Sequence, residues 1–146
     1  MVQIFLDEPK DFKPDCQVST VFMECEDSIL LLLRARYEHS ADTWGIPGGK
    51  LEHNETPLEA LIRELDEELK LKPPISALEF KRSIFVKHPK VHYILHLYVW
   101  KLDSFPEVIL DPCEHTDLKW LKMSLLDTVP LIEGQLEAFK IAYEKQ

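Results

Sequence analysis

Residues 49–71 of the chain read GKLEHNETPLEALIRELDEELKL, and this stretch carries the clearest secondary-structure signal in the sequence. Thr56 can cap a helix, Pro57 suits the first helical position, and Glu59 completes a T-x-x-E capping box. At about 100° per residue, the aliphatic side chains fall on one face, which consists of Leu58, Leu61, Ile62, Leu65 and Leu69. We therefore expect an amphipathic helix over residues 56–69 that packs on a hydrophobic core.

Acidic residues of the same segment lie on an arc beside this aliphatic face. Glu64, Glu67 and Glu68 are spaced i, i+3 and i+4, where like charges destabilise an isolated helix by a few tenths of a kcal/mol. Carboxylates converging from one helix suit Mg²⁺ or Mn²⁺, which accept a few carboxylates and keep waters for substrate phosphates. The pattern alone leaves two interpretations open, a metal site and a solvated acidic face crossed by ion pairs.

The fixed residues of this stretch resemble the Nudix box, G-x5-E-x7-R-E-U-x-E-E-x-G-U, in which U is an aliphatic residue. The matching fixed positions are Gly49, Glu55, Arg63, Glu64, Glu67 and Glu68. Leu65 and Leu71 match the aliphatic positions, whereas Lys70 stands where the box has a glycine. The preceding residues 44–52 also resemble the strand and loop that lead into the box. The sequence is thus similar to Nudix hydrolases over most of its length.

This resemblance implies the Nudix fold, an α+β (α/β/α) sandwich with a central mixed β-sheet flanked by helices. It also implies Mg²⁺-dependent attack of water on a phosphoanhydride of a nucleoside diphosphate linked to another group, with Mn²⁺ as a possible substitute. Carried over by position, Glu64, Glu67, Glu68 and the Gly49 carbonyl correspond to metal ligands, with Glu67 and Glu68 as direct ligands. Glu64 corresponds to a ligand or to the general base.

Two further residues of the box correspond to supporting positions. Arg63 and Glu55 correspond to residues that hold the loop and the helix together by ion pairing. We group Arg63 with Glu64 and Glu67 as catalytic. Lys70 raises a separate question, because glycine suits a left-handed helix cap. A side chain there costs about 1 kcal/mol, or else the helix continues toward Pro73.

Candidate site residues also lie outside the box. Glu114-His115, shortly before Trp120, resembles an E-H-x4-W pattern of many Nudix enzymes. We expect Glu114 on a loop, where its carboxylate completes the metal site or deprotonates water. Candidate phosphate contacts are Arg34, Arg36 and Lys50, and Trp44 is a candidate for stacking on a base. Residues 130–133, Pro-Leu-Ile-Glu, offer no amide to read a base, which leaves Glu133 as the candidate there.

Three histidines invite a zinc interpretation that the local pattern disfavours. His88, His92 and His96 are spaced for metal ligands on a helix, but residues 91–100 alternate like a strand. No thiolate or further histidine lies at ligand spacing. We therefore expect the strand face of His92 and His96 to line the substrate cleft or to face solvent.

The remaining segments predict an α+β protein. Residues 16–24 and 28–34 form a predicted hairpin around Glu26-Asp27, and residues 78–87 and 91–102 form a second strand pair. We expect an extended piece over residues 44–47, a turn at Gly48-Gly49, a strand over residues 117–121 and a helix over residues 133–144. The whole chain, residues 1–146, is expected to be one domain, with residues 1–14 as a loosely held arm or an edge strand.

Composition narrows the function classes. The net charge of −9 argues against a nucleic acid polymer as partner, and an acidic protein that handles a polyanion needs a cation between the two. No apolar run approaches the ~20 residues of a membrane span. The three cysteines, Cys16, Cys25 and Cys113, suggest reduced thiols and, with the absence of an apolar leader, a cytoplasmic protein. We expect a monomer or a homodimer.

Three functions remain compatible with these features. The first is a nucleoside triphosphate pyrophosphatase that acts on a small nucleotide and releases a monophosphate and pyrophosphate. The second keeps the same chemistry on a dinucleoside polyphosphate, a nucleotide sugar or ADP-ribose. The third is a non-catalytic Nudix module that binds a nucleotide, although the complete set Glu64, Glu67 and Glu68 argues against it.

Overall fold

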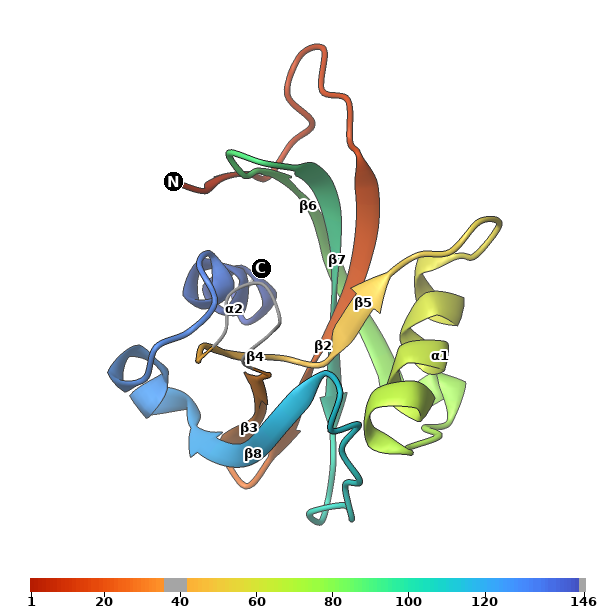
Figure 1. The fold of residues 1–146 in the computed structure, drawn as a ribbon, viewed down its shortest axis with the longest axis vertical. Coiled ribbons are helices and arrows are strands. Elements are labelled where there is room, and N and C mark those ends of the chain that lie inside the picture. The colour runs from red at the N-terminus through yellow and green to blue at the C-terminus, as the bar shows by residue number, and fades with distance from the viewer. Residues whose placement is uncertain (36–41, 145–146) are drawn as a thin grey trace.

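A mixed β-sheet lies between two helices in the computed structural model, which describes residues 1–35 and 42–144 (Figure 1). The helices are α1 (Pro57–Leu69) and α2 (Gln135–Ala142), and short 3-10 turns cover Ile75–Ala77 and Met123–Thr128. The strands are β1 (Gln3–Phe5), β2 (Cys16–Cys25), β3 (Ser28–Arg34), β4 (Trp44–Gly45), β5 (Gly48–Lys50), β6 (Leu78–Lys87), β7 (His92–Lys101) and β8 (His115–Lys122).

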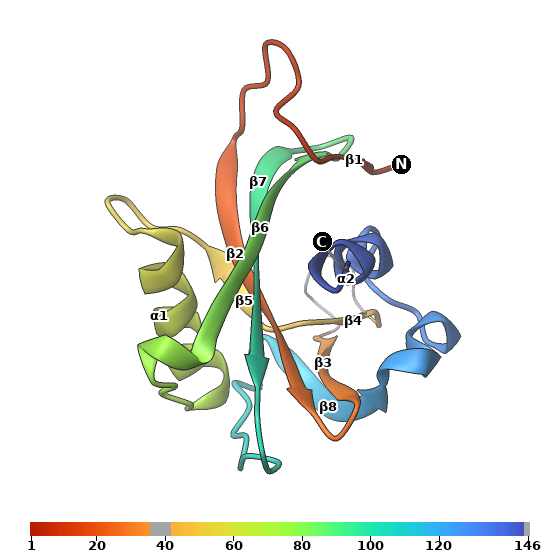
Figure 2. The ribbon, with the colours of Figure 1, turned by 180° about the vertical axis from the view of Figure 1, so that it is seen from behind.

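The sheet divides at strand β2. Its main path runs β1-β6-β7-β2-β3-β4, with β8 beside β3, and β2 and β7 form a parallel pair whereas the other strand pairs are antiparallel. β2 pairs with β3 only at the hairpin end, through Glu24 and Cys25. Farther from the turn, β5 occupies the same edge of β2 over Val18–Thr20. Strands β2 and β3 therefore diverge, and the β4–β5 segment crosses between the two faces of the sheet (Figures 1 and 2).

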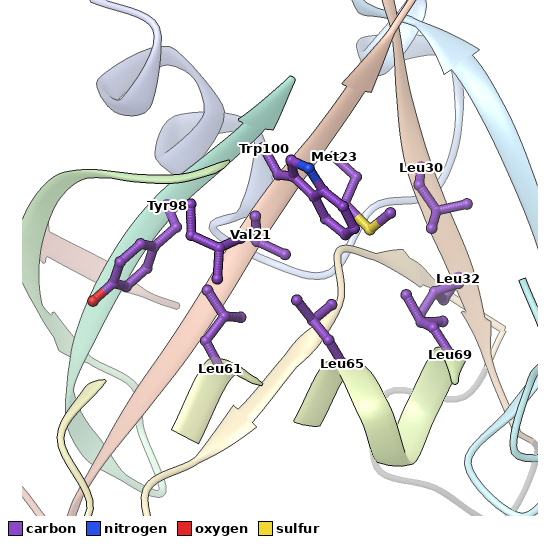
Figure 3. Close-up of a cluster of buried hydrophobic side chains, with 10 residues drawn as sticks. Val21, Met23, Leu30, Leu32, Leu61, Leu65, Leu69, Tyr98 and Trp100 are labelled. Carbon is purple, nitrogen blue, oxygen red and sulfur yellow. The ribbon is translucent and has the colours of Figure 1, made fainter. Parts of the chain in front are cut away.

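The two helices cover opposite faces of this sheet (Figures 1 and 2). Leu61, Leu65 and Leu69 of α1 are fully buried against β2, β3 and β7, where they meet side chains such as Val21 and Trp100 (Figure 3). Each fully buried leucine contributes about 1.5–3 kcal/mol through the hydrophobic effect. On the other face, small and aromatic side chains of α2 pack on a second cluster that contains Phe22, Ile84, Leu97, Ala138 and Ala142. The result is the expected α/β/α sandwich.

Helix α1 begins and ends as its sequence indicates. The Thr56 side chain accepts a hydrogen bond from the Glu59 N–H, and the Glu59 carboxylate accepts one from the Thr56 N–H, which completes the capping box. Of the two alternatives at Lys70, the structure has the left-handed cap, with φ of 57°. Its backbone N–H donates to the carbonyl of Asp66. The helix therefore stops at Leu69 and does not continue toward Pro73.

Most strand predictions agree with the structure. Strands β3 and β6 have the expected bounds, and β2, β7 and β8 differ from theirs by a few residues at their ends. The prediction of a turn at Gly48-Gly49 is wrong, because both residues belong to β5 and pair with β2. The C-terminal helix is shorter than the expected 133–144, since Gly134, with φ of 89°, precedes its first turn. Within residues 1–14, Gln3–Phe5 form an edge strand on β6.

His96 has a structural role that the alternation of β7 alone did not reveal. Its side chain is buried on the α1 side of the sheet, where Nδ1 lies 2.6 Å from Ser83 Oγ and Nε2 lies 2.7 Å from Gln17 Oε1. His92 stacks on the ring of Phe12. The opposite face of β7, which carries Tyr93 and Leu95, lines the cavity described below. The expectation that the face of His96 lines a cleft or meets solvent is therefore wrong.

The described residues contain no disulfide bond and no membrane-spanning helix. Cys16, Cys25 and Cys113 all lie in the described part of the chain and are free thiols. Among the same residues, neither helix has the length and apolar character needed to cross a bilayer.

Candidate active site

A cavity of about 490 Å³ opens where strands β2 and β3 diverge. One part of its lining, called here the acidic wall, consists of Glu64 and Glu68 from α1 and of Glu114, which precedes β8. The β5 residues Gly48 and Gly49 also line the cavity. A second part, called here the apolar wall, comes from β1, β6, β7 and the segment around α2, and consists of Val2, Ile4, Val86, Tyr93, Leu95, Ile132 and Ala138.

Two glycines of β5 allow the acidic wall to approach the sheet. A Cβ atom on Gly49 would overlap the Glu64 carboxyl group, and one on Gly48 would overlap the Ser19 carbonyl oxygen of β2. Only residues without a side chain allow this close approach. Gly48 and Gly49, which predicted a turn, therefore allow the carboxyl groups of α1 to lie directly against β5.

Glu68 is the most unusual residue of the acidic wall. It is 3% exposed, it accepts a hydrogen bond from the Gly48 N–H, and its Oε2 atom has no partner among the described residues. The Glu64 carboxyl group lies within hydrogen-bonding reach. Burial raises the pKa of Glu68 well above its ordinary value, and the charges of Glu64 and Glu114 raise it further. A buried carboxylate facing further acids is stabilised when a cation joins it.

Arg63 holds the loop before the helix and the acidic wall together. Its Nε and Nη2 donate to both oxygens of Glu55, at 2.7 and 2.9 Å, and Nη2 also donates to the Lys50 carbonyl oxygen at 3.0 Å. Its Nη1 donates to Oε1 of Glu64 at 2.9 Å. Hydrogen bonds from Arg63 lower the pKa of Glu55 to about 2, and Glu55 in turn raises the pKa of Arg63. Arg63 does not line the cavity, so it positions Glu64 from behind.

Glu67 lies apart from the other two acids of the helix. Its side chain is 59% exposed, it is not part of the cavity lining, and its Oε2 accepts a hydrogen bond from Arg63 Nη1 at 3.2 Å. The periodicity places all three acids on one arc, but only Glu64 and Glu68 point into the cavity.

Arg34 and His115 form the side of the cavity next to Glu114. They are paired residues of β3 and β8, at a point where the register of the two strands shifts. Arg34 Nε and His115 Nδ1 are buried and have no hydrogen-bond partner among the described residues. Burial and the charge of Arg34 lower the pKa of His115 to about 4, so its imidazole is neutral at pH 7. This side of the cavity presents a cationic group and a neutral ring nitrogen to a bound molecule.

The structure places some of the other candidate binding residues in the cavity lining and others outside it. Lys50 and Glu133 line the cavity, as Arg34 does. Trp44 does not line it; its ring packs on the core beneath α2, and Lys119 Nζ lies 4.1 Å from its centroid. Arg36 lies outside the described residues. The sequence analysis missed Gln135, whose side-chain oxygen accepts a hydrogen bond from the Ile46 N–H at 3.2 Å inside the lining. The sequence signal for it is an amide side chain two residues after Glu133.

Comparison with known proteins agrees with this geometry. The family model of the NUDIX domain matches residues 15–141, a range that includes all of α1 and most of the cavity lining. The chain belongs to the Nudix family. Like its relatives it is a pyrophosphohydrolase that acts on nucleotide-like substrates.

Three relatives illustrate the similarity of this Nudix enzyme. It is 30% identical over 128 residues to the CTP pyrophosphohydrolase of Escherichia coli, which covers 84% of this chain and 90% of that protein. A MutT Nudix hydrolase of Burkholderia pseudomallei has the same fold, with a TM-score of 0.75, 24% identity and coverage of 86% and 95%. A bifunctional NMN adenylyltransferase/ADP ribose pyrophosphatase of Francisella tularensis, complexed with AMP and a Mn ion, has a TM-score of 0.74, 26% identity and coverage of 92% and 42%.

The acidic wall of the Nudix enzyme fits the divalent metal ion that enzymes of this family generally use. The fit rests on the unpartnered Oε2 of Glu68 beside the Glu64 carboxyl group. No preformed cage of three or more acidic, histidine or cysteine ligands is present among residues 1–35 and 42–144. Carboxylate oxygens are ligands that divalent ions such as Mg²⁺ and Mn²⁺ accept in proteins, with waters and substrate phosphates completing the coordination.

Proposed function

We propose that this Nudix enzyme is a Mg²⁺-dependent nucleoside triphosphate pyrophosphatase that releases a nucleoside monophosphate and pyrophosphate. The observation that carries the proposal is the pairing of two walls in one cavity. The buried carboxyl group of Glu68, with Glu64 and Glu114 beside it, lines one part, and apolar side chains with an amide line another. A nucleoside triphosphate has the matching halves, a polyanion and a flat, largely apolar base. The name of the Escherichia coli relative, a CTP pyrophosphohydrolase, supports the same class of substrate.

The metal would be held by the Glu64 and Glu68 carboxylates, the Gly49 carbonyl and Glu114, which lies on the turn before β8. Glu67 is a further proposed ligand, because its single 3.2 Å contact with Arg63 and its exposure allow the carboxylate to rotate toward the cavity. When bound, the metal neutralises charge on the phosphate chain and acidifies or orients the attacking water.

The chain's own residues supply the rest of the chemistry. As the alternative to ligating the metal, Glu64, which Arg63 fixes in place, is the proposed acceptor of the proton that the water loses. Arg34 and Lys50 line the same cavity and are the proposed contacts to phosphate oxygens. The unpartnered Arg34 Nε gives this assignment physical support, since a buried N–H without an acceptor costs about 1–3 kcal/mol that a ligand oxygen recovers. Arg36 is retained as a proposed phosphate contact on the sequence alone.

The base would lie against the apolar wall. Gln135 is the proposed group that reads its edge, because its side-chain oxygen is engaged by the Ile46 N–H while its NH₂ group provides two donors. A fixed amide of this kind discriminates bases that present an acceptor from those that present a donor. The position of Trp44 in the core removes the support for stacking of that ring on the base.

A panel of substrates tests this proposal. The purified enzyme is incubated with Mg²⁺ and each of the common ribo- and deoxyribonucleoside triphosphates, a dinucleoside tetraphosphate, ADP-ribose and a nucleotide sugar, and the products are separated and identified. We expect the highest kcat/KM on a triphosphate. A higher kcat/KM on one of the other compounds would leave the proposed metal chemistry in place and would show that the proposed substrate is wrong. Binding of nucleotides without turnover of any compound would favour the non-catalytic module.

A further inference from the structure

A strand from the beginning of the chain forms part of the apolar wall. Val2 and Ile4, in and beside β1, line the cavity together with the segment that leads into α2, although they lie more than a hundred residues away in sequence. Both ribbon views show β1 and α2 on the same side of the sheet (Figures 1 and 2). The side chains of Val2 and Ile4 also face Gly134, the residue before α2.

β1 is held to the body of the protein along two sides. On one side it is an edge strand of three residues that pairs with β6, from Gln3 beside Lys87 to Phe5 beside Phe85. On the other side, the Glu133 Oε1 accepts a hydrogen bond from the Val2 N–H at 2.7 Å. A short edge strand is marginal by its ladder alone, so the packing of Val2 and Ile4 on the core and the hydrogen bond to Glu133 both help to fix its position.

We infer that Glu133 is a positioning residue that anchors β1 as the closing side of the apolar wall, and that it does not itself contact the base. This inference rests on the proposed function, since it assigns a role within the same cavity. Oε1 of the Glu133 carboxylate accepts the hydrogen bond from the Val2 N–H, and the side chains of Val2 and Ile4 line the cavity that a base would occupy. The candidate base reader of the sequence analysis thus acts through the strand that it holds.

The geometry makes a distinctive prediction for binding. Loss of the hydrogen bond between Glu133 and Val2 loosens one side of the apolar wall and therefore weakens the binding of every base alike. Loss of a direct contact with the base would weaken only the binding of the bases that make this contact. Because the acidic wall comes from α1 and the turn before β8, the reacting phosphates are not displaced. The anchor therefore affects KM and nucleotide affinity more than kcat.

The test compares Glu133→Ala with Glu133→Gln, which keeps an oxygen that can accept from the Val2 N–H. Glu137→Ala serves as the matched control, because Glu137 is an exposed acid in the first turn of α2 outside the cavity lining. We expect Glu133→Ala to raise KM and the Kd of each nucleoside monophosphate about three- to tenfold, uniformly over the bases, with kcat within twofold of the parent. Glu133→Gln and Glu137→Ala should stay within twofold in all of these quantities.

An NMR measurement separates this inference from the proposed function. In ¹H–¹⁵N spectra of the free protein, Glu133→Ala should shift the amide resonances of Val2, Gln3 and Ile4 and speed their exchange with solvent, while Glu133→Gln leaves them near their original positions. Unchanged β1 amides in Glu133→Ala, or a KM effect confined to one base, would overturn the inference. Shifted amides in a protein that binds no nucleotide would support the anchor and refute the proposed function.

Discussion

Replacing Glu68 by Gln separates the charge of the acidic wall from its shape. The side chain is 3% exposed, keeps the Gly48 N–H as a partner after substitution, and loses a negative charge that faces Glu64 and Glu114. Two opposite effects follow. The folded protein without metal no longer has to bury an incompletely paired carboxylate, and the metal loses a ligand.

The size of the stability effect follows from burial. Burying a charge without full pairing costs several kcal/mol in real proteins, and the hydrogen bond from Gly48 to a neutral acceptor is weaker by about 1 kcal/mol. The net expectation is a gain of about 1–2 kcal/mol in the free energy of unfolding without metal, or about 3–6 °C in Tm for a chain of this size. Turnover with Mg²⁺ should fall about 10²-fold or more, which corresponds to about 2.7 kcal/mol of lost transition-state stabilisation.

The assay measures Tm by calorimetry with a chelator and with Mg²⁺, together with kcat, for the parent, Glu68→Gln and Asp66→Asn. Asp66 is an acid of the same helix that is not part of the cavity lining, and its substitution changes the charge equally. We expect Mg²⁺ to raise the Tm of the parent and of Asp66→Asn but not that of Glu68→Gln. If Glu68→Gln keeps turnover within about threefold of the parent, the acidic wall is a solvated face and the reasoning fails.

The same geometry makes four further predictions. Exhaustive chelation should abolish hydrolysis, and Mg²⁺ or Mn²⁺ should restore it; full activity of a preparation shown by elemental analysis to be free of metal would contradict the metal assignment. Arg63→Ala should lower both Tm and turnover, the latter about tenfold or more, because Glu64 loses the donor that fixes it. The pKa of Glu55 is lowered to about 2 in the folded protein, so Glu55 stabilises the parent fully above its unfolded pKa near 4.5, and this stabilisation is lost as the pH falls toward 2. In a series of Tm measurements over this pH range, Arg63→Ala should lack that loss of stability. The same pH dependence of Tm in the parent and in Arg63→Ala would refute the pairing of Glu55 with Arg63. Gly49→Ala should reduce kcat about tenfold or more while the circular dichroism spectrum stays native, because the added Cβ displaces the Glu64 carboxylate; parent-like kcat would show that the close packing of Glu64 on β5 is dispensable.

Local patterns predicted the helix and most strands because their causes are local. The capping box at Thr56 and the leucine face of α1 depend on residues a few positions apart, and both agree with the structure. The glycine pair was misassigned because Gly48-Gly49 is a turn signal in isolation, whereas its need for glycine comes from β2 and from Glu64. That reason lies in tertiary contacts which a local pattern does not contain.

The candidate site was predicted as a set of acids but not as a cavity. Periodicity places Glu67 and Glu68 on one arc, and only the crossing of β5 decides that Glu68 is buried while Glu67 lies beside Arg63. The apolar wall could not be predicted, since β1 and the segment before α2 meet only in the folded chain. The role of His96 could not be predicted for the same reason. Strand alternation assigns it a face of the sheet but does not reveal the hydrogen bonds of its ring with Ser83 and Gln17.

Phosphorus NMR of the reaction tests the central claim most directly. The enzyme is mixed with Mg²⁺ and CTP, the nucleotide named in the description of the Escherichia coli relative, and the products are followed as they form. The account predicts that nucleoside monophosphate and pyrophosphate resonances grow together in equal amounts, and that neither grows with Glu68→Gln on the same time scale. Release of nucleoside diphosphate and inorganic phosphate, or equal rates for the parent and Glu68→Gln, would contradict it.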